Sequence, residues 1–131
     1  MIPFALRHPR ILYALTLAWW GAMLLGTSLP GSAAPKLPLG DKLVHFTAYA
    51  GMGLLAALSL RVQRRAPRLA ARPYRATLLA AGAYALLDEL HQLMIPRRSF
   101  EAWDLLADVL GAAAGILIAR VLAERGRAPA E

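Results

Sequence analysis

The sequence contains no cysteine and few acidic residues. The absence of cysteine from all 131 residues excludes disulfide bonds, thiol catalysis and thiolate metal sites. Only 8 residues are Asp or Glu, against 15 Lys or Arg, so the formal net charge is +7. The length is that of one domain, and we assign residues 1–131 to a single domain.

Charge is also missing from long stretches, and these stretches predict helices that span a membrane. The chain is 58% hydrophobic, more than is usual for a soluble domain. A spanning helix needs about 20 mostly apolar residues. The apolar blocks therefore predict an all-α integral membrane protein, a bundle of four transmembrane helices at about 10–29, 42–61, 75–95 and 102–122.

The prolines support this division. All nine lie outside the four segments, and proline breaks helix interiors but is tolerated in loops and at helix starts. A cleaved signal peptide is the alternative for the first segment, because Arg7 and Arg10 precede it. Its uncharged run, residues 11–29, is longer than the 7–15 residues usual in signal peptides, which favours a retained helix.

Basic residues gather on one side of the predicted topology. The Arg-rich loop 61–75 contains six arginines and no acid, and with the two terminal segments that side holds eleven basic residues against four on the other. The positive-inside rule predicts that both termini and this loop are cytoplasmic. The arginines are expected to contact membrane lipid. Nucleic-acid binding is the alternative, but no motif supports it, so no nucleic-acid partner is predicted.

Ionisable and polar residues also occur within the outer half of the predicted helices. Counting outward from Arg61, Arg75 and Arg120 at about 1.5 Å per residue gives one layer about 18–20 Å above the cytoplasmic boundary and a second near about 24 Å. The deeper layer contains Tyr49, Asp88 and Asp108, the outer layer contains His45, His91 and Asp104, and Asp41 lies one turn above. A charge at mid-membrane costs about 2.5–3.5 kcal/mol, so these groups are expected to pair, take up protons or face a wet cavity.

The spacing within the helices refines this prediction. Asp104, Asp108, Gly111 and Gly115 fall on one helical stripe, and its Gly-x-x-x-Gly part allows close approach of a neighbouring backbone. The bundle should therefore close tightly below and open into a polar pocket above. Glu89 lies about 100° around the helix from Asp88, which predicts a different partner for it or a place at the lipid interface.

Two motifs carry a resemblance to a known family. The stretch "DKLVHFTAY" (41–49) is similar to an Asp-Lys-x-x-His-Phe-x-x-Tyr signature, and "DELHQLMIPRRSFEAWDLLADVLG" (88–111) is similar to an Asp-Glu-x-x-Gln…Pro-x-Arg…Asp-x-x-x-Asn-x-x-Gly block. Both resemble the VanZ-like family of small bacterial membrane proteins. The matching positions are Asp41, Lys42, His45, Tyr49, Asp88, Glu89, Gln92, Arg98, Asp104 and Gly111. In two departures, Arg97 stands where the family often has glycine and Asp108 where asparagine is common.

The resemblance implies a multi-pass protein of the bacterial cytoplasmic (inner) membrane with a link to glycopeptide resistance, teicoplanin in particular. It implies no particular biochemical activity. With the polar layers it leads us to expect an outer-leaflet pocket that binds an anionic amphiphile or a cell-wall-precursor head group and contributes to resistance or envelope homeostasis. The ligand could be lipid-linked or a lipoglycopeptide.

The predicted ligand-binding residues come from the two motif regions. They are Asp41, Lys42, His45, Tyr49, Asp88, Glu89, His91, Gln92, Arg97, Arg98, Asp104 and Asp108. Lys42, Arg97 and Arg98 are expected to take the anion, while the carboxylates and His45 orient the arginines and accept hydrogen bonds. No catalytic residue, cofactor or metal is predicted.

Two other functions stay open. One is a membrane-embedded hydrolase or transferase acting on a lipid-linked substrate, since histidine beside carboxylates suits acid–base chemistry. A metal in such an enzyme would take His45, His91, Asp88 and Asp108, although no tight ligand motif is present. The other is a structural subunit of a membrane complex, whose buried polar network fixes helix packing. Homo-oligomerisation is also left open.

Overall fold

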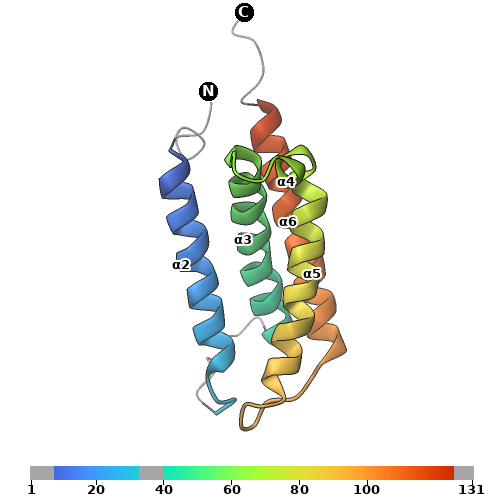
Figure 1. Ribbon diagram of the computed structural model, residues 1–131. Helices are drawn as coiled ribbons and strands as arrows, with labels where there is room; N and C mark the ends of the chain where they lie inside the picture. Colours follow the sequence, from blue (N-terminus) through green and yellow to red (C-terminus); the bar gives the residue numbers. More distant parts are fainter. Residues whose placement is uncertain (1–7, 33–39, 126–131) are drawn as a thin grey trace, which may run out of the picture.

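The computed structural model describes residues 8–32 and 40–125, and within these ranges all regular structure is helical. The elements are α2 (Pro9–Ser28), α3 (Asp41–Val62), α4 (Pro67–Ala71), α5 (Pro73–Gln92) and α6 (Ala102–Arg125). Four long helices run alongside one another, and the short α4 lies across one end of α3 and α5 (Figure 1). The all-α prediction is confirmed.

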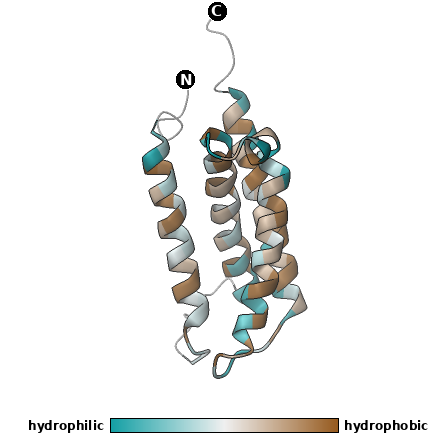
Figure 2. Cartoon of the chain, viewed as in Figure 1, coloured by the Kyte–Doolittle hydropathy of each residue, from teal (hydrophilic) through white to brown (hydrophobic). Residues whose placement is uncertain are grey.

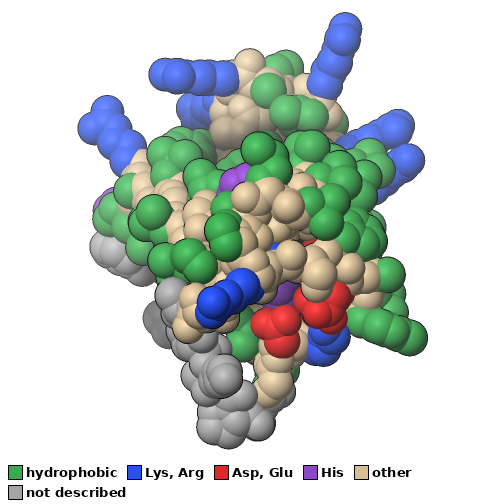
Figure 3. All heavy atoms as spheres, turned by 90° about the horizontal axis from the view of Figure 1, so that it is seen from below, with side chains coloured by type: hydrophobic (Ala, Val, Ile, Leu, Met, Phe, Trp, Pro, Cys, Tyr) green, Lys and Arg blue, Asp and Glu red, His purple; other side chains and the backbone are tan. Residues whose placement is uncertain are grey.

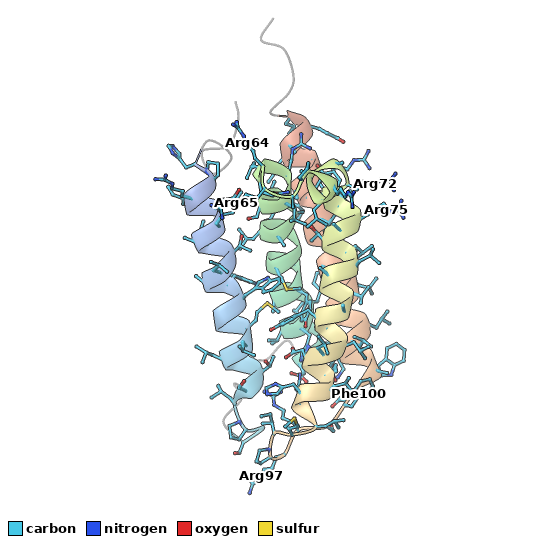
Figure 4. All side chains as sticks on the ribbon, in the orientation of Figure 1. Arg64, Arg65, Arg72, Arg75, Arg97 and Phe100 are labelled. Atoms are coloured by element: carbon cyan, nitrogen blue, oxygen red, sulfur yellow. The ribbon has the colours of Figure 1, made fainter. Side chains whose placement is uncertain are left out.

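The two ends of the bundle differ in chemistry. We call the end that carries α4 the α4 end, and the opposite end, where residues 93–101 connect α5 to α6, the turn end. Figure 2 shows hydrophilic residues at both ends and hydrophobic ones between them. Arg64, Arg65, Arg72 and Arg75 lie at the α4 end, and Arg97 lies at the turn end (Figure 4). The arginine-rich segment therefore lies on the opposite end from the acidic motif.

Three helices are long and apolar enough to cross a membrane: α2, α3 and α6. Their outward faces carry apolar side chains, with Leu25 73% and Leu117 61% exposed, as expected of surfaces that meet lipid. α5 does not reach the same apolarity. Any 18-residue window within its 20 residues includes Arg75, Asp88 and Glu89. Both of these acids, Asp88 and Glu89, are buried inside the bundle and do not face its outer surface.

The helix boundaries differ from the predicted ones where proline acts. Pro9, Pro67 and Pro73 occupy the first turns of α2, α4 and α5, where the missing N–H costs no helical hydrogen bond. The predicted loop 61–75 therefore contains a short helix. α5 ends at Gln92 instead of 95, because Pro96 disfavours helical backbone at the residue before it.

α3 and α6 pack with their backbones in close contact. A Cβ at Gly111 would lie 2.2 Å from the carbonyl oxygen of Phe46, and one at Gly115 would lie 2.0 Å from that of Ala50. From the other side, a Cβ at Gly53 would meet the α6 backbone at 2.4 Å. The close approach predicted from the Gly-x-x-x-Gly spacing is confirmed, and the neighbour is α3.

Two tryptophans attach α2 to the rest of the bundle. The Trp19 indole N–H donates to the carbonyl oxygen of Ala48 at 2.9 Å, and its ring fills the space beside Gly51. Trp20 stacks on Tyr84 of α5 with ring centroids 5.4 Å apart. These contacts lie halfway along α2. The half of that helix toward the turn end lines a cavity, which is described below with the candidate site.

The glycine packing predicts the effect of adding one methyl group. Gly115→Ala should lower the free energy of unfolding by about 1–3 kcal/mol, because the new Cβ meets backbone that cannot rotate away. Gly82→Ala is the matched control, since nothing lies within 4 Å of a Cβ there. It should be neutral or stabilising by up to about 1 kcal/mol through helix propensity. Denaturation in detergent micelles measures both, and equal effects would contradict the close packing.

Candidate functional site

Polar side chains from three helices meet inside the bundle near the turn end. Each of the following is buried: His45, Asp88, Glu89, Gln92, Asp104 and Asp108. Viewed from the turn end, acidic, basic and histidine side chains lie close together, and hydrophobic side chains lie mostly toward the edge of the view (Figure 3). All six belong to the set predicted from the sequence, and the bundle brings them together from α3, α5 and α6.

His45 lies at the centre of this cluster. Its Nδ1 is 2.9 Å from Oδ1 of Asp108, a hydrogen bond between α3 and α6 inside the protein. On its other side, Nε2 lies 3.9 Å from Asp104 Oδ2 and 4.0 Å from Asp41 Oδ1. The imidazole therefore has carboxylates on both sides.

Lys42 is occupied by two acids of the α5–α6 corner. Its Nζ donates a hydrogen bond to Oε2 of Glu101 at 2.5 Å. It also lies 2.5 Å from Oδ1 of Asp104, an ion pair without the alignment of a hydrogen bond. Asp104 is only 3% exposed, so Lys42 supplies the positive charge that this buried carboxylate needs. Lys42 was predicted to bind an anionic ligand, but its ammonium group is already neutralised by protein carboxylates.

α5 contributes two carboxylates that face different partners. The Tyr49 hydroxyl donates to Oδ2 of Asp88 at 3.4 Å. Glu89 accepts a hydrogen bond from the backbone N–H of Glu101 at 2.9 Å and a longer one, 3.4 Å, from the Gln92 amide. The 100° offset therefore gives Glu89 its own partner, as predicted. Its location at the lipid interface, the other possibility, is wrong, because the residue is fully buried.

The turn between α5 and α6 separates its two arginines. Arg97 has a φ of 61°, a left-handed conformation that glycine adopts at little cost. Its side chain extends outward from the turn end (Figure 4). Arg98 instead turns toward α2, and its Nε donates to the carbonyl oxygen of Leu29 at 3.4 Å. Of the two predicted anion-binding arginines, the structure brings only Arg98 to the cluster.

A cavity of about 340 Å³ opens beside this cluster. Its lining comes from α2, α3, α5 and the turn: Trp19, Ala22, Met23, Gly26, Thr27, Asp41, Val44, His45, Ala48, Tyr49, Asp88 and Arg98. Five of the twelve predicted site residues line it, namely Asp41, His45, Tyr49, Asp88 and Arg98. The wall formed by α2 was missed by sequence reasoning, because its residues are those of any apolar span. Thr27 near the end of α2 was the one available signal.

The remaining predicted residues lie behind or away from the cavity. Glu89, Gln92, Asp104 and Asp108 are buried next to its polar wall, while Lys42 and Arg97 lie outside it. His91 is only half-buried, and its Nδ1 has no hydrogen-bond partner among the residues that the structure describes. In the described part of the chain, the groups that could hold a metal ion are Asp41–His45–Asp104 and His45–Glu89–Asp108. The predicted metal ligands His91 and Asp88 therefore do not converge with His45.

Apolar helices around a buried polar cluster define a helical membrane protein. A family model described as VanZ/LLP1 matches residues 3–123, nearly the whole chain, and the protein belongs to this family. The resemblance read from the two motifs is confirmed. No curated protein and no solved structure matches the chain. The backbone at Arg97 is left-handed, which fits the glycine expected at this position from the resemblance.

The ion pair of Lys42 can be measured by a double-mutant cycle. Lys42→Met should lower the free energy of unfolding by about 1–3 kcal/mol, since buried Asp104 loses its counter-charge while Lys42 itself is half-exposed and screened. Combining it with Asp104→Leu should recover most of that loss. The matched control is Arg120→Met in the exposed Arg120–Glu124 pair, which should matter less. A Lys42 effect no larger than the control would contradict the assigned role.

Proposed function

We propose that the protein binds the head group of an anionic amphiphile in the cavity between α2, α3 and α5. The observation that carries the proposal is the two-sided lining of this cavity. α2 contributes apolar side chains such as Trp19 and Met23, whereas α3, α5 and the turn contribute His45, Asp88 and Arg98. An amphiphile matches such a lining, because its chain and its head group need opposite environments.

The polar wall suits a head group that combines a negative charge with hydroxyl or amide groups. Arg98 is the cation of the lining, and a guanidinium can hold a phosphate or carboxylate through two parallel hydrogen bonds. Asp41 and Asp88 can accept hydrogen bonds from hydroxyl or amide groups. The anion would thus rest on one arginine, in place of the three cations expected from the sequence.

A lipid or a lipid-linked cell-wall precursor has this chemistry. We propose that capture of such a molecule is how the protein contributes to glycopeptide resistance or to envelope homeostasis, with the ligand entering sideways from the membrane. Membership of the VanZ/LLP1 family supports the link to the cell envelope.

We further propose that α5 also crosses the membrane, with the α4 end cytoplasmic and the turn end outside. The arginines at the α4 end support this orientation through the positive-inside rule. Because the chain lacks cysteine, single cysteines can be introduced without background. In spheroplasts, an impermeant maleimide should label Ser99→Cys, and should label Arg68→Cys only after permeabilisation. The reverse pattern would contradict the orientation.

Binding can be followed through Trp19, which lies in the cavity wall. In protein with Trp20→Phe and Trp103→Phe, held in phosphatidylcholine nanodiscs, brominated phosphatidate should quench Trp19 more strongly than brominated phosphatidylcholine. Arg98→Ala should weaken this preference about tenfold to a hundredfold, the loss expected for a charge-assisted hydrogen bond. Tryptophan fluorescence against lipid fraction gives the measurement.

The neighbouring arginine provides the control. Arg97→Gly removes the same charge from the same turn, suits the left-handed backbone, and lies outside the cavity. It should keep the preference for phosphatidate. Equal quenching by the two lipids in the starting protein, or equal losses in the two arginine variants, would overturn the proposal.

The hydrogen-bonded pair of His45 and Asp108 favours a second candidate function. A carboxylate that orients an imidazole at a cavity wall is the arrangement of a general base. The protein would then hydrolyse or transfer the head group that it binds. Release of phosphate from phosphatidate in the same nanodiscs would establish turnover, and unchanged lipid after prolonged incubation would leave binding alone.

A further inference from the structure

Three buried side chains from three different helices converge deep to the cavity wall. His45 of α3, Glu89 of α5 and Asp108 of α6 each place one nitrogen or oxygen within 4.8 Å of the other two. His45 is 8% exposed, and both carboxylates are fully buried. A nitrogen and two oxygens with this spacing can all bind one cation.

The shortest of these separations fits adjacent ligands of a transition metal. His45 Nδ1 and Asp108 Oδ1 are 2.9 Å apart. Metal–ligand bonds of about 2.0–2.1 Å place neighbouring ligand atoms about 3 Å apart at octahedral angles and slightly farther apart at tetrahedral ones. The two atoms could therefore move from a mutual hydrogen bond to a shared ion with little displacement.

Asp108 has an oxygen that nothing in the described protein satisfies. Its Oδ2 is buried and has no hydrogen-bond partner within residues 8–32 and 40–125. Among the described residues, no Lys or Arg lies within 4.0 Å of Asp108 or Glu89. An unpaired carboxylate oxygen is unfavourable in a low-dielectric interior, and a divalent cation bound to both acids would compensate their charge.

The surroundings hold the three ligands in place. The backbone N–H of Glu101 donates to Oε2 of Glu89, which leaves Oε1 with only the long contact to Gln92. With Nδ1 of His45 on the ion, its Nε2–H would point toward Asp104, 3.9 Å away, in the carboxylate–histidine–metal pattern that fixes ring orientation.

The other group, Asp41–His45–Asp104, is a weaker candidate. Asp104 is already paired with Lys42, and the Asp41 side chain is 57% exposed. We therefore propose that His45, Glu89 and Asp108 form a binding site for one divalent transition-metal ion of the zinc type, for which one imidazole and two carboxylates are suitable ligands. The site shares His45 with the proposed amphiphile cavity but does not depend on amphiphile binding.

The test uses Zn²⁺ alone as the probe. Protein in phosphatidylcholine nanodiscs is stripped with a chelator, titrated with Zn²⁺, and analysed by elemental mass spectrometry and calorimetry. One zinc per chain is expected. Glu89→Gln and Asp108→Asn, each close in shape to the original residue, should weaken binding at least tenfold, since even residues that only support a ligand cost about 10–100-fold. Asp41→Asn, the control from the other group, should bind within a few-fold of the unchanged protein.

Several results would overturn the proposal. These are zinc no higher than in nanodiscs without protein, or a loss in Asp41→Asn as large as that in Glu89→Gln. If a variant loses the circular dichroism of a helical protein, the visible absorption spectrum of Co²⁺ added to the unchanged protein tests the site instead. Intense visible bands of four- or five-coordinate Co²⁺ support the site, and the spectrum of hydrated Co²⁺ overturns it. Arg98→Ala should bind zinc normally while losing the phosphatidate preference, so failure of one proposal is distinguishable from failure of the other.

Discussion

The close contact between α3 and α6 sets the distance between His45 and Asp108, the pair at the centre of the buried polar cluster. The two helices run in the same direction, and their contacts advance in step along both. Gly115 meets Ala50, and Gly111 meets Phe46 one turn nearer the turn end. The next residue on the α6 stripe is Asp108, which reaches His45 at 2.9 Å. Backbones held apart by larger side chains would leave that distance too long for a hydrogen bond.

Specific partners explain how so many acids are tolerated in one half of an apolar bundle. Each buried carboxylate has at least one specific partner: Lys42 for Asp104, the Glu101 N–H for Glu89, and Tyr49 for Asp88. Hydrogen bonding is weak at Asp88, whose bond from Tyr49 is 3.4 Å long, and is missing at Oδ2 of Asp108, which has no partner among the described residues. Incomplete satisfaction is expected where a protein reserves polar groups for a ligand. Those two positions border the cavity and the three-ligand group.

Much of this arrangement could be predicted from the sequence, because depth along a helix depends only on residue count. Counting from the basic ends put Tyr49 beside Asp88 and His45 beside Asp104, and both pairs approach each other in the structure. The direction a side chain faces is different. It depends on how each helix is rotated against its neighbours. Residue counting therefore could not predict that Glu89 is buried or that His91 lies outside the polar cluster.

The orientation of the turn arginines and the cavity-lining face of α2 could not be predicted from the sequence, for other reasons. Residue type alone does not distinguish the two arginines of "IPRRS", although only Arg98 matches the family motif. The left-handed backbone at Arg97 sends one outward and lets Arg98 turn toward α2, and that conformation is a property of the closed turn. The apolar residues of α2 predict a span but not which of them faces a cavity, because lipid and an apolar cavity wall select the same side chains.

His45 connects the two proposed sites through a single ring. Its Nδ1 faces Asp108, its Nε2 faces Asp104 and Asp41, and the residue lines the cavity. An ion on Nδ1 would fix the proton on Nε2, which sets whether that edge of the ring donates or accepts a hydrogen bond. A head group in the cavity would therefore meet His45 with a different hydrogen-bonding character when the ion is bound. Thermodynamic linkage then requires that each ligand change the affinity of the other by the same factor.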